Sequence, residues 1–251
     1  MSNRYSRNRI YIDEQAQETI KGYPIIIGGS GIGSVIAECA LRLGFENMTI
    51  VDGDRVEQSN LNRQNYTGSD VGTTKTSAIQ TRLQAINKNA TVNVYDCFIT
   101  GKNIEELVNG HKAAINALDF TSDIPFQFDK ICKAHKIPVL HPYNLGWGGL
   151  AIVIEPEGMP LTGIANNHEK FNELTVVEYV SSQLKYLGTP QIWLDRVIEN
   201  YLQEEEQLSP PQLSIASWVA AAMCTHILFN LATNQKIKMF PEFYFSSLDN
   251  C

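Results

Sequence analysis

Cysteine pairs are missing from this sequence. Its 251 residues include five cysteines, and none stands in a C-x-x-C arrangement. We therefore expect neither a disulfide framework nor a zinc site, and scattered free thiols are typical of a reducing compartment such as the cytoplasm. The stretch before Tyr23 is polar and contains no apolar run, so no secretory signal is visible in it.

Positive charge is also scarce. Lysine and arginine together number 20 against 27 acidic residues, which gives a formal net charge of −7. A chain of this charge does not offer the basic surface that binds nucleic acid, so no nucleic-acid partner is expected.

Long apolar stretches are limited to one. Residues 215–232 contain no Asp, Glu, Lys or Arg, but polar residues such as Thr225 and Asn230 interrupt the stretch, and no basic cluster flanks it. A membrane span would show flanking basic or aromatic anchors. We expect a buried core helix or a dimer-interface helix here, and no membrane partner.

The clearest pattern in the sequence is a strand, a glycine-rich turn, a helix and a second strand within residues 24–54. An isoleucine run predicts a buried parallel strand, and glycines at 28, 29, 31 and 33 follow at once. Gly44 ends the predicted helix, and the next strand delivers Asp52, 19 residues after Gly33. This arrangement is typical of nucleotide-binding βαβ units, in which glycines admit a phosphate and the acid binds ribose hydroxyls.

One position departs from the G-x-G-x-x-G pattern. Ser30 stands where a glycine is expected. A serine fits if its φ stays negative, and its hydroxyl is then placed to donate to a phosphate. A tight turn with no ligand is the alternative interpretation of the whole glycine cluster.

Strands and helices alternate through the first 145 residues, which predicts an α/β fold with a mostly parallel, Rossmann-like sheet flanked by helices. Beyond residue 156 the chain becomes mainly helical, with helices expected at 169–186, 191–206 and 215–232 and a late antiparallel strand near 239–245. We expect residues 1–155 to form a nucleotide-binding core and residues 156–251 to extend the same domain. The second strand leads into a polar segment, and Thr73 or Thr74 is expected to cap the helix that follows.

Cations and acids follow the predicted strands at their carboxyl ends. Asn60, Arg63, Lys75 and Asp119 join Asp52 there, and ligands of open α/β sheets bind at this edge. Chemistry on a nucleoside triphosphate uses this mixture, because cations hold the phosphates and a carboxylate holds Mg²⁺. A dehydrogenase would instead need a proton donor near its nicotinamide.

These residues resemble those of a known family. The segments 4–7 (Arg-Tyr-Ser-Arg), 28–33, 52–54, 60–64 (Asn-Leu-Asn-Arg-Gln) and 71–75, together with Asp119, stand in the order and spacing of the E1-like superfamily. The sequence is most similar to its ThiF/MoeB/HesA adenylyltransferases. The likeness covers residues 1–155 well and the helix at 215–232 loosely.

The resemblance implies an enzyme that adenylates the C-terminal glycine carboxylate of a small ubiquitin-like or sulfur-carrier protein, or of a peptide, with MgATP. It implies that Asp52 binds ribose, that Asn60, Arg63 and Lys75 hold phosphates, and that Asp119 binds Mg²⁺. Arg7 would enter the active site of a partner subunit, which implies a homodimer. The remaining nucleotide-binding positions implied are Gly28, Ser30, Gly31, Gly33, Asp54 and Gln64.

Several family features are absent. The chain lacks the zinc cysteines, has no cysteine within residues 144–212, and carries Asn116 where relatives often have an acid near the metal. We therefore expect adenylation without a covalent cysteine on the usual loop. An inactive E1-like scaffold and an NAD- or FAD-dependent oxidoreductase remain as alternatives.

Overall fold

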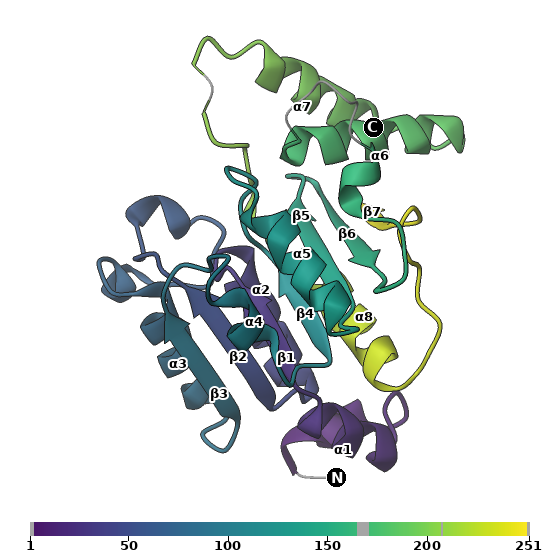
Figure 1. Ribbon diagram of the computed structural model, residues 1–251. Helices are drawn as coiled ribbons and strands as arrows, with labels where there is room; N and C mark the ends of the chain where they lie inside the picture. Colours follow the sequence, from purple (N-terminus) through teal and green to yellow (C-terminus); the bar gives the residue numbers. More distant parts are fainter. Residues whose placement is uncertain (1–2, 165–170, 207, 250–251) are drawn as a thin grey trace.

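The computed structural model describes residues 3–164, 171–206 and 208–249. Its centre is a sheet of seven strands in the order β3-β2-β1-β4-β5-β6-β7 (Figure 1). The first five strands run parallel, and β6 and β7 are antiparallel to their neighbours. The strands are β1 (Ile25–Gly28), β2 (Asn47–Asp52), β3 (Thr91–Asp96), β4 (Ala113–Asn116), β5 (Val139–Asn144), β6 (Gly148–Ile154) and β7 (Tyr244–Ser247). The predicted mostly parallel α/β sheet with a late antiparallel strand is confirmed.

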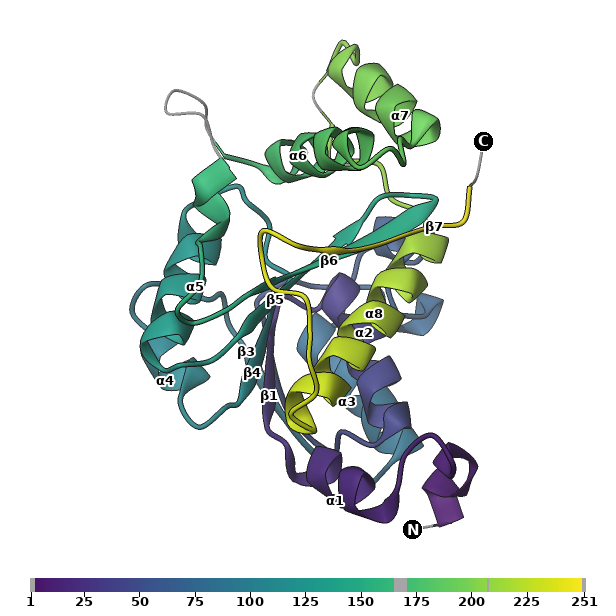
Figure 2. The same cartoon turned by 90° about the vertical axis from the view of Figure 1, so that its right-hand side faces the viewer.

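Helices cover both faces of the sheet (Figure 2). One face carries α2 (Ile32–Leu43), α3 (Lys75–Ile86) and α8 (Ser214–Ala232), and the other carries α4 (Ile104–Val108) and α5 (Ile124–Ala134). The helix α1 (Glu14–Gly22) lies near the amino-terminal ends of the parallel strands, whereas α6 (Glu173–Tyr186) and α7 (Ile192–Leu202) lie beyond the opposite edge. Short 3-10 turns are η1 (Asn3–Asn8), η2 (Gln58–Asn60), η3 (Gly68–Asp70) and η4 (Leu161–Ile164).

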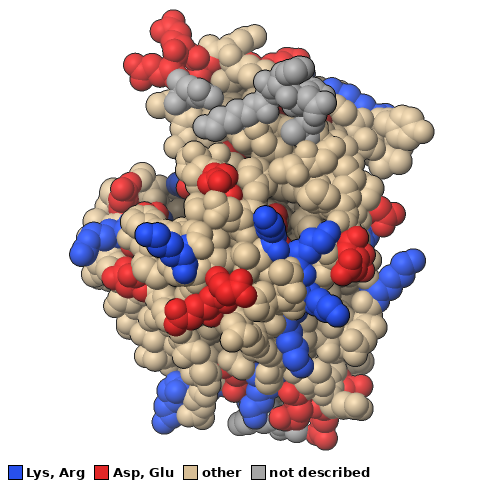
Figure 3. All heavy atoms as spheres, in the orientation of Figure 1, with Lys and Arg blue, Asp and Glu red and all other residues tan. Residues whose placement is uncertain are grey.

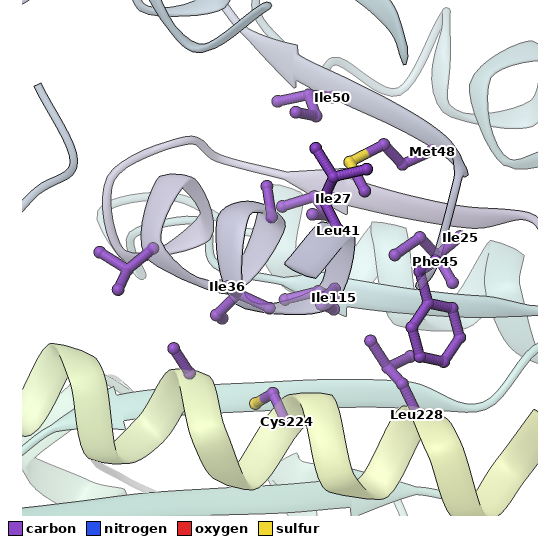
Figure 4. Packing of buried hydrophobic residues seen from close by; sticks show 14 of the residues in the cluster. Ile25, Ile27, Ile36, Leu41, Phe45, Met48, Ile50, Ile115, Cys224 and Leu228 are labelled. Atoms are coloured by element: carbon purple, nitrogen blue, oxygen red, sulfur yellow. The ribbon is translucent and has the colours of Figure 1, made fainter. Parts of the chain in front are cut away.

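The sheet is buried on both faces, so its central strands carry no polar alternation. In β1, Ile25 and Ile27 pack toward α2 and α8, and Ile26 between them belongs to the hydrophobic cluster on the α5 side. Figure 4 shows the first of these layers, with Phe45 and Leu228 among the side chains that fill it. A strand that is covered by apolar layers on both faces needs an apolar residue at every position, which is why the isoleucine run is continuous.

The helix α8 is the long apolar stretch of the sequence. It is the one helix of the described residues that is long and apolar enough to cross a membrane, and 56% of that window is buried inside the protein. Its buried side chains, among them Cys224 and Leu228, join the core cluster that includes residues of α2 and β6. The helix is hydrophobic nearly all round because α2 and the sheet enclose much of it.

Element boundaries differ from prediction mainly in the second half of the chain. The last strand is Tyr244–Ser247, so the expected strand start near residue 239 was wrong; Pro241 has no N–H to give to a ladder. The helix α7 ends at Leu202, four residues short of the predicted end, before the acidic run. The start predicted for α6 at residue 169 lies outside the described residues. Thr74 is the cap of α3, as predicted, and accepts a hydrogen bond from Ser77 N–H.

The C-terminal segments complete the sheet begun by the N-terminal half. The strand β7 pairs with β6, and α8 packs beside α2 on the same face. The division of the chain at residue 155 stays a prediction.

Candidate active site

Three loops meet at the carboxyl edge of the sheet. In the strand register, Gly28 lies opposite Val51 on one side and Asn116 on the other. The glycine turn after β1, the acid that ends β2 and the loop after β4 are therefore neighbours. Ligands of open α/β sheets bind at this edge because loops from adjacent strands converge there.

The glycines of the turn serve two different purposes. A side chain at Gly29, whose φ is +88°, would place its Cβ 2.4 Å from the carbonyl oxygen of Ala117, and at Gly33 the Cβ would lie 2.7 Å from Ile27 Cγ2. Those positions need glycine for packing. Gly31 is different, because an added Cβ would meet only the side chain of Gln64, at 3.3 Å.

Gly31 is also the N-cap of α2, and no side chain caps this helix end. The first N–H groups of a helix lack partners within it and carry the positive end of the helix dipole. An anion is the natural partner for such an end. The side-chain amide of Gln64 lies beside Gly31, and its buried Oε1 has no hydrogen-bond partner, so it can still accept a hydrogen bond.

Ser30 does not face the space in front of the helix. It is fully buried, and its Oγ and its N–H both donate to Asp52 Oδ2, at 2.9 and 2.6 Å. Tyr66 donates its phenolic proton to the Ser30 carbonyl oxygen (2.8 Å) and Oγ (3.0 Å). In this structure the Ser30 hydroxyl donates to Asp52 and not toward the helix end, and its donation to a phosphate stays a prediction. Within the described residues, φ is positive at only three non-glycine positions, and Ser30 is not among them.

An ion pair spans the site from β2 to the start of α3. Lys75 Nζ lies 2.9 Å from Asp54 Oδ2, and only 9% of the lysine side chain is exposed against 53% for the aspartate. The backbone supports this geometry, because Lys75 N–H donates to the Asp54 carbonyl oxygen. Asp54 thus holds the lysine through two bonds, one to its backbone N–H and one to its ammonium group.

Arg63 and Asn60 belong to the loop between β2 and α3. Asn60 Oδ1 caps the turn η2 by accepting the Glu57 N–H at 3.0 Å. The Arg63 guanidinium donates to the Ser59 carbonyl oxygen at 2.9 Å, and its Nε donates to Gln212 Oε1. Gln212 lies in the segment before α8, so a distant part of the chain closes over this loop.

Asp119, in the loop after β4, is the electrostatic centre of the group. Desolvation raises its pKa, as do the charges of Glu173, Asp54 and Asp52, whereas Lys75 lowers it. Burial lowers the pKa of Arg63, and the charge of Asp119 opposes this effect by raising it.

These effects of charge on pKa indicate that the two cations and the acid lie in one neighbourhood, because such effects weaken with distance. They are the residues that the sequence predicted would converge: Arg63, Lys75 and Asp119. Their assignment as phosphate and metal ligands stays a prediction, as do those of Asn60, Gln64 and the glycines.

The described residues contain no group of three or more His, Cys, Asp or Glu side chains arranged to hold a metal ion. This donor set does not suit zinc, but it fits Mg²⁺ bound to a nucleotide. Mg²⁺ commonly takes one or two carboxylates, with phosphate oxygens and water completing its shell. Asp119, among neighbouring acids that a cation would offset, is the carboxylate that would hold the ion.

Arg7 lies away from this site. It stands in η1, which is tied to the opposite edge of the sheet by Tyr5, whose hydroxyl donates to Glu46 Oε1 at 2.8 Å just before β2 begins. Its side chain is exposed. Arg7 cannot serve the site of its own chain from there, and a role in a second subunit stays a prediction.

Asn116, where the resemblance led us to expect an acid near the metal, is held by two hydrogen bonds. Its Nδ2 donates to Asp129 Oδ1 at 2.8 Å and to the Pro125 carbonyl oxygen at 2.9 Å, beneath the Asp119 loop. His141, 1% exposed, lies 3.0 Å from Asp129 Oδ2. An aspartate at 116 would face Asp129 directly, so the amide belongs to a buried structural network.

Four residues of this region have contacts that the sequence did not predict. Tyr66 holds Ser30, Gln212 holds Arg63, and Glu173 Oε1 accepts the Phe120 N–H at 2.9 Å beside Asp119. Phe98 is 65% exposed and lies against Gly53, where a Cβ would come within 2.8 Å of the ring. Only Phe98 had a signal, since an aromatic residue just after a strand end can face a ligand. The others come from loops or from α6, with no spacing to reveal them.

Comparisons with known proteins identify a family. Residues 5–245 match the ThiF family. The SAMP-activating enzyme E1 of Haloferax volcanii is 27% identical over 62% of the chain and 59% of its own length. The sulfur carrier protein ThiS adenylyltransferase of Bacillus subtilis is 32% identical over 64% and 49%. The tRNA threonylcarbamoyladenosine dehydratase of Haemophilus influenzae is 31% identical over 53% and 51%. The matches thus span about half to three-fifths of these relatives.

The fold is shared with solved structures. Escherichia coli MccB, crystallised with ATP, superposes with a TM-score of 0.71 over 99% of this chain and 72% of its own, at 18% identity. At that identity the likeness concerns the fold. The family match covers nearly the whole chain, and so this protein belongs to the ThiF family.

Proposed function

We propose that this protein is an ATP-dependent adenylyltransferase that activates the C-terminal carboxylate of a small ubiquitin-like or sulfur-carrier protein. The observation that carries the proposal is the convergence of Arg63, Lys75 and Asp119 at the carboxyl edge of the sheet, in front of the α2 N-terminus. Two cations and a carboxylate beside a helix N-terminus suit a triphosphate with its metal ion.

The reaction joins two anions. A carboxylate oxygen of the acceptor attacks the α-phosphorus of ATP, the bond to the bridging oxygen breaks, and pyrophosphate leaves with that oxygen. Lys75 and Arg63 would offset the charge on the phosphates, and the N–H groups at the start of α2 would hold them in place. Mg²⁺, held by Asp119, would offset further negative charge when bound. No nucleophilic side chain is required, because positioning two substrates supplies much of the rate.

Ribose and base also find groups suited to them. Asp52 ends β2 next to the glycine turn, where its free acceptor capacity can take a ribose hydroxyl. The exposed ring of Phe98 lies beside Gly53, one residue further along, and offers a flat face for a purine. In this arrangement the sugar would lie between the base and the phosphates.

A protein acceptor is favoured over RNA by charge. The relatives include enzymes named for sulfur carriers and one named for a tRNA nucleoside, so family membership leaves the acceptor open. The chain carries a net charge of −7, and Figure 3 shows acidic and basic side chains interspersed on the face that it draws. RNA binding relies on an extended basic surface. We further propose that the enzyme works in the cytoplasm as a homodimer, with Arg7 supplied in trans.

The alternatives predict different behaviour. An oxidoreductase is not favoured, because the chain matches the ThiF family and its site gathers cations rather than a hydride-transfer apparatus. An inactive scaffold would bind a nucleotide without turnover. The distinction between scaffold and enzyme therefore depends on chemistry.

The test is ATP–pyrophosphate exchange with candidate carriers that end in Gly-Gly. Exchange is expected with Mg²⁺ and a free C-terminal carboxylate, and a carrier with an amidated C-terminus should give none. Arg63→Ala and Asp119→Ala should each abolish exchange while circular dichroism shows an intact fold. Lys136→Ala, at the opposite edge of the sheet, is the matched control and should keep full activity. Wild-type rates in both site variants would refute the assignment.

A further inference from the structure

Asp52 is already engaged by hydrogen bonds from its own chain. Its Oδ2 accepts the Ser30 N–H at 2.6 Å and the Ser30 hydroxyl at 2.9 Å, and its Oδ1 accepts the Asp54 N–H at 2.7 Å. Asp52 is 9% exposed, so few other donors can reach it. A carboxylate has about four lone-pair sites. Three are occupied before any ligand arrives.

We infer that Ser30 is a specificity-determining residue that leaves Asp52 able to hold only one ribose hydroxyl. This inference rests on the proposed function, in which Asp52 faces the ribose of ATP. A ribose presents neighbouring 2′ and 3′ hydroxyls, and a carboxylate with two free acceptor sites can bind both. The Ser30 hydroxyl removes one of those sites. A glycine at position 30, as the nucleotide-binding pattern has it, would supply only the backbone N–H and would leave both sites free.

Tyr66 also binds Ser30, but the bond from the Ser30 hydroxyl to Asp52 is made by Ser30 itself. The Tyr66 hydroxyl is buried, donates to the Ser30 carbonyl oxygen and Oγ, and stays protonated because burial raises its pKa. The Ser30 hydroxyl thus accepts one hydrogen bond from Tyr66 and donates its own proton to Asp52. The three side chains form a chain of donors that runs from Tyr66 through Ser30 to Asp52, and each member is 91% or more buried.

Two substitutions separate the roles of these side chains. Ser30→Ala removes the hydroxyl that occupies Asp52 but keeps the backbone N–H bond, and Tyr66 retains the Ser30 carbonyl oxygen as its acceptor. Tyr66→Phe disturbs the same buried network but leaves the Ser30 hydroxyl on Asp52. The serine variant should therefore open an acceptor site, and the tyrosine variant should not.

The experiment measures binding of ATP, 2′-deoxyATP and 3′-deoxyATP by isothermal titration calorimetry, with Mg²⁺ present. The wild type should lose affinity for one of the two deoxynucleotides only. Ser30→Ala should bind ATP about tenfold more tightly than it binds either deoxynucleotide, so that both analogues become poor ligands. A factor of about ten corresponds to the loss of one hydrogen bond to a charged group. Tyr66→Phe should keep the wild-type pattern. Thermal denaturation confirms that each variant is folded before it is titrated.

The outcomes separate this inference from the proposed function. If the wild type binds no nucleotide, the proposed function fails and this inference fails with it. If the wild type binds ATP but discriminates against both deoxynucleotides, or Ser30→Ala keeps the wild-type pattern, only the role of Ser30 is refuted. If Tyr66→Phe acquires the Ser30→Ala pattern, the matched control has failed and the assignment to the serine hydroxyl is wrong.

Discussion

Replacing Gly31 by alanine tests how closely a ligand approaches the glycine turn. The added Cβ would lie 3.3 Å from Gln64 Nε2, the end of a flexible side chain that can move by a few tenths of an ångström. Losing glycine at an N-cap costs about 1 kcal/mol, and the lower entropy of the unfolded chain returns about 0.4–1 kcal/mol. The free energy of unfolding should therefore stay within about 1 kcal/mol of the wild type.

Nucleotide binding should respond far more strongly. The methyl group would project into the space beside the α2 N-terminus, where we place the phosphates. We expect the affinity for MgATP to fall at least about tenfold, which corresponds to ~1.4 kcal/mol. The assay is isothermal titration calorimetry at one pH, combined with thermal denaturation of the same preparations. For a chain of this size, ~1 kcal/mol corresponds to a shift in Tm of about 2–4 °C.

Two other glycines provide matched controls. At Gly33 the Cβ would lie 2.7 Å from Ile27 Cγ2, so Gly33→Ala should lower stability by about 1–3 kcal/mol through overpacking, less the gain of alanine within a helix. At Gly68 nothing lies within 4 Å, so Gly68→Ala should change neither stability nor binding. Wild-type ATP affinity in Gly31→Ala would show that phosphates do not approach this turn and would refute the reasoning.

Three further predictions concern the surroundings of the site. Asp119→Asn should raise the Tm at pH 7 and leave it unchanged in acid. Burial and Glu173 raise the pKa of Asp119 in the folded state, so its charge destabilises the fold increasingly as the pH rises from the ordinary carboxyl pKa through the raised value. A lower Tm of the variant at pH 7 would contradict this. Asn116→Asp should lower the free energy of unfolding by about 3 kcal/mol or more, because a second buried carboxylate would replace the donor to Asp129. The Tm should fall by about 6–12 °C, and an unchanged Tm would contradict this prediction. Phe98→Ala should weaken MgATP binding about tenfold in calorimetry and leave inorganic triphosphate binding unchanged; equal loss for both ligands would exclude stacking.

The sequence was most informative where local pattern and burial agree. The isoleucine run of β1 predicts a buried strand because both faces of that strand meet apolar helices. Thr74 was recognisable as a cap because its side chain serves a backbone group three residues away. The ends of helices and strands were less predictable where they depend on contacts with distant residues. The strand β7, for example, forms by pairing with β6.

The site shows the same division. Asp52, Lys75 and Asp119 could be predicted to converge, because the carboxyl ends of parallel strands meet at one edge. Glu173 and Gln212 could not, since they reach the site from beyond residue 156 through contacts that leave no periodic signal. The hydrogen bonds of Ser30 could not be predicted, because its partners Asp52 and Tyr66 are distant in sequence.

The most direct test of the central claim is the Mg²⁺-dependent affinity for ATP of three proteins: the wild type, Lys75→Gln and Lys136→Gln. Lys75 is nearly buried at the site, whereas Lys136 is exposed just before β5 at the opposite edge of the sheet. Calorimetry should show binding to the wild type, at least about tenfold weaker binding to Lys75→Gln, and unchanged binding to Lys136→Gln. An absence of binding to the wild type, or equal affinities for the wild type and Lys75→Gln, would contradict the account.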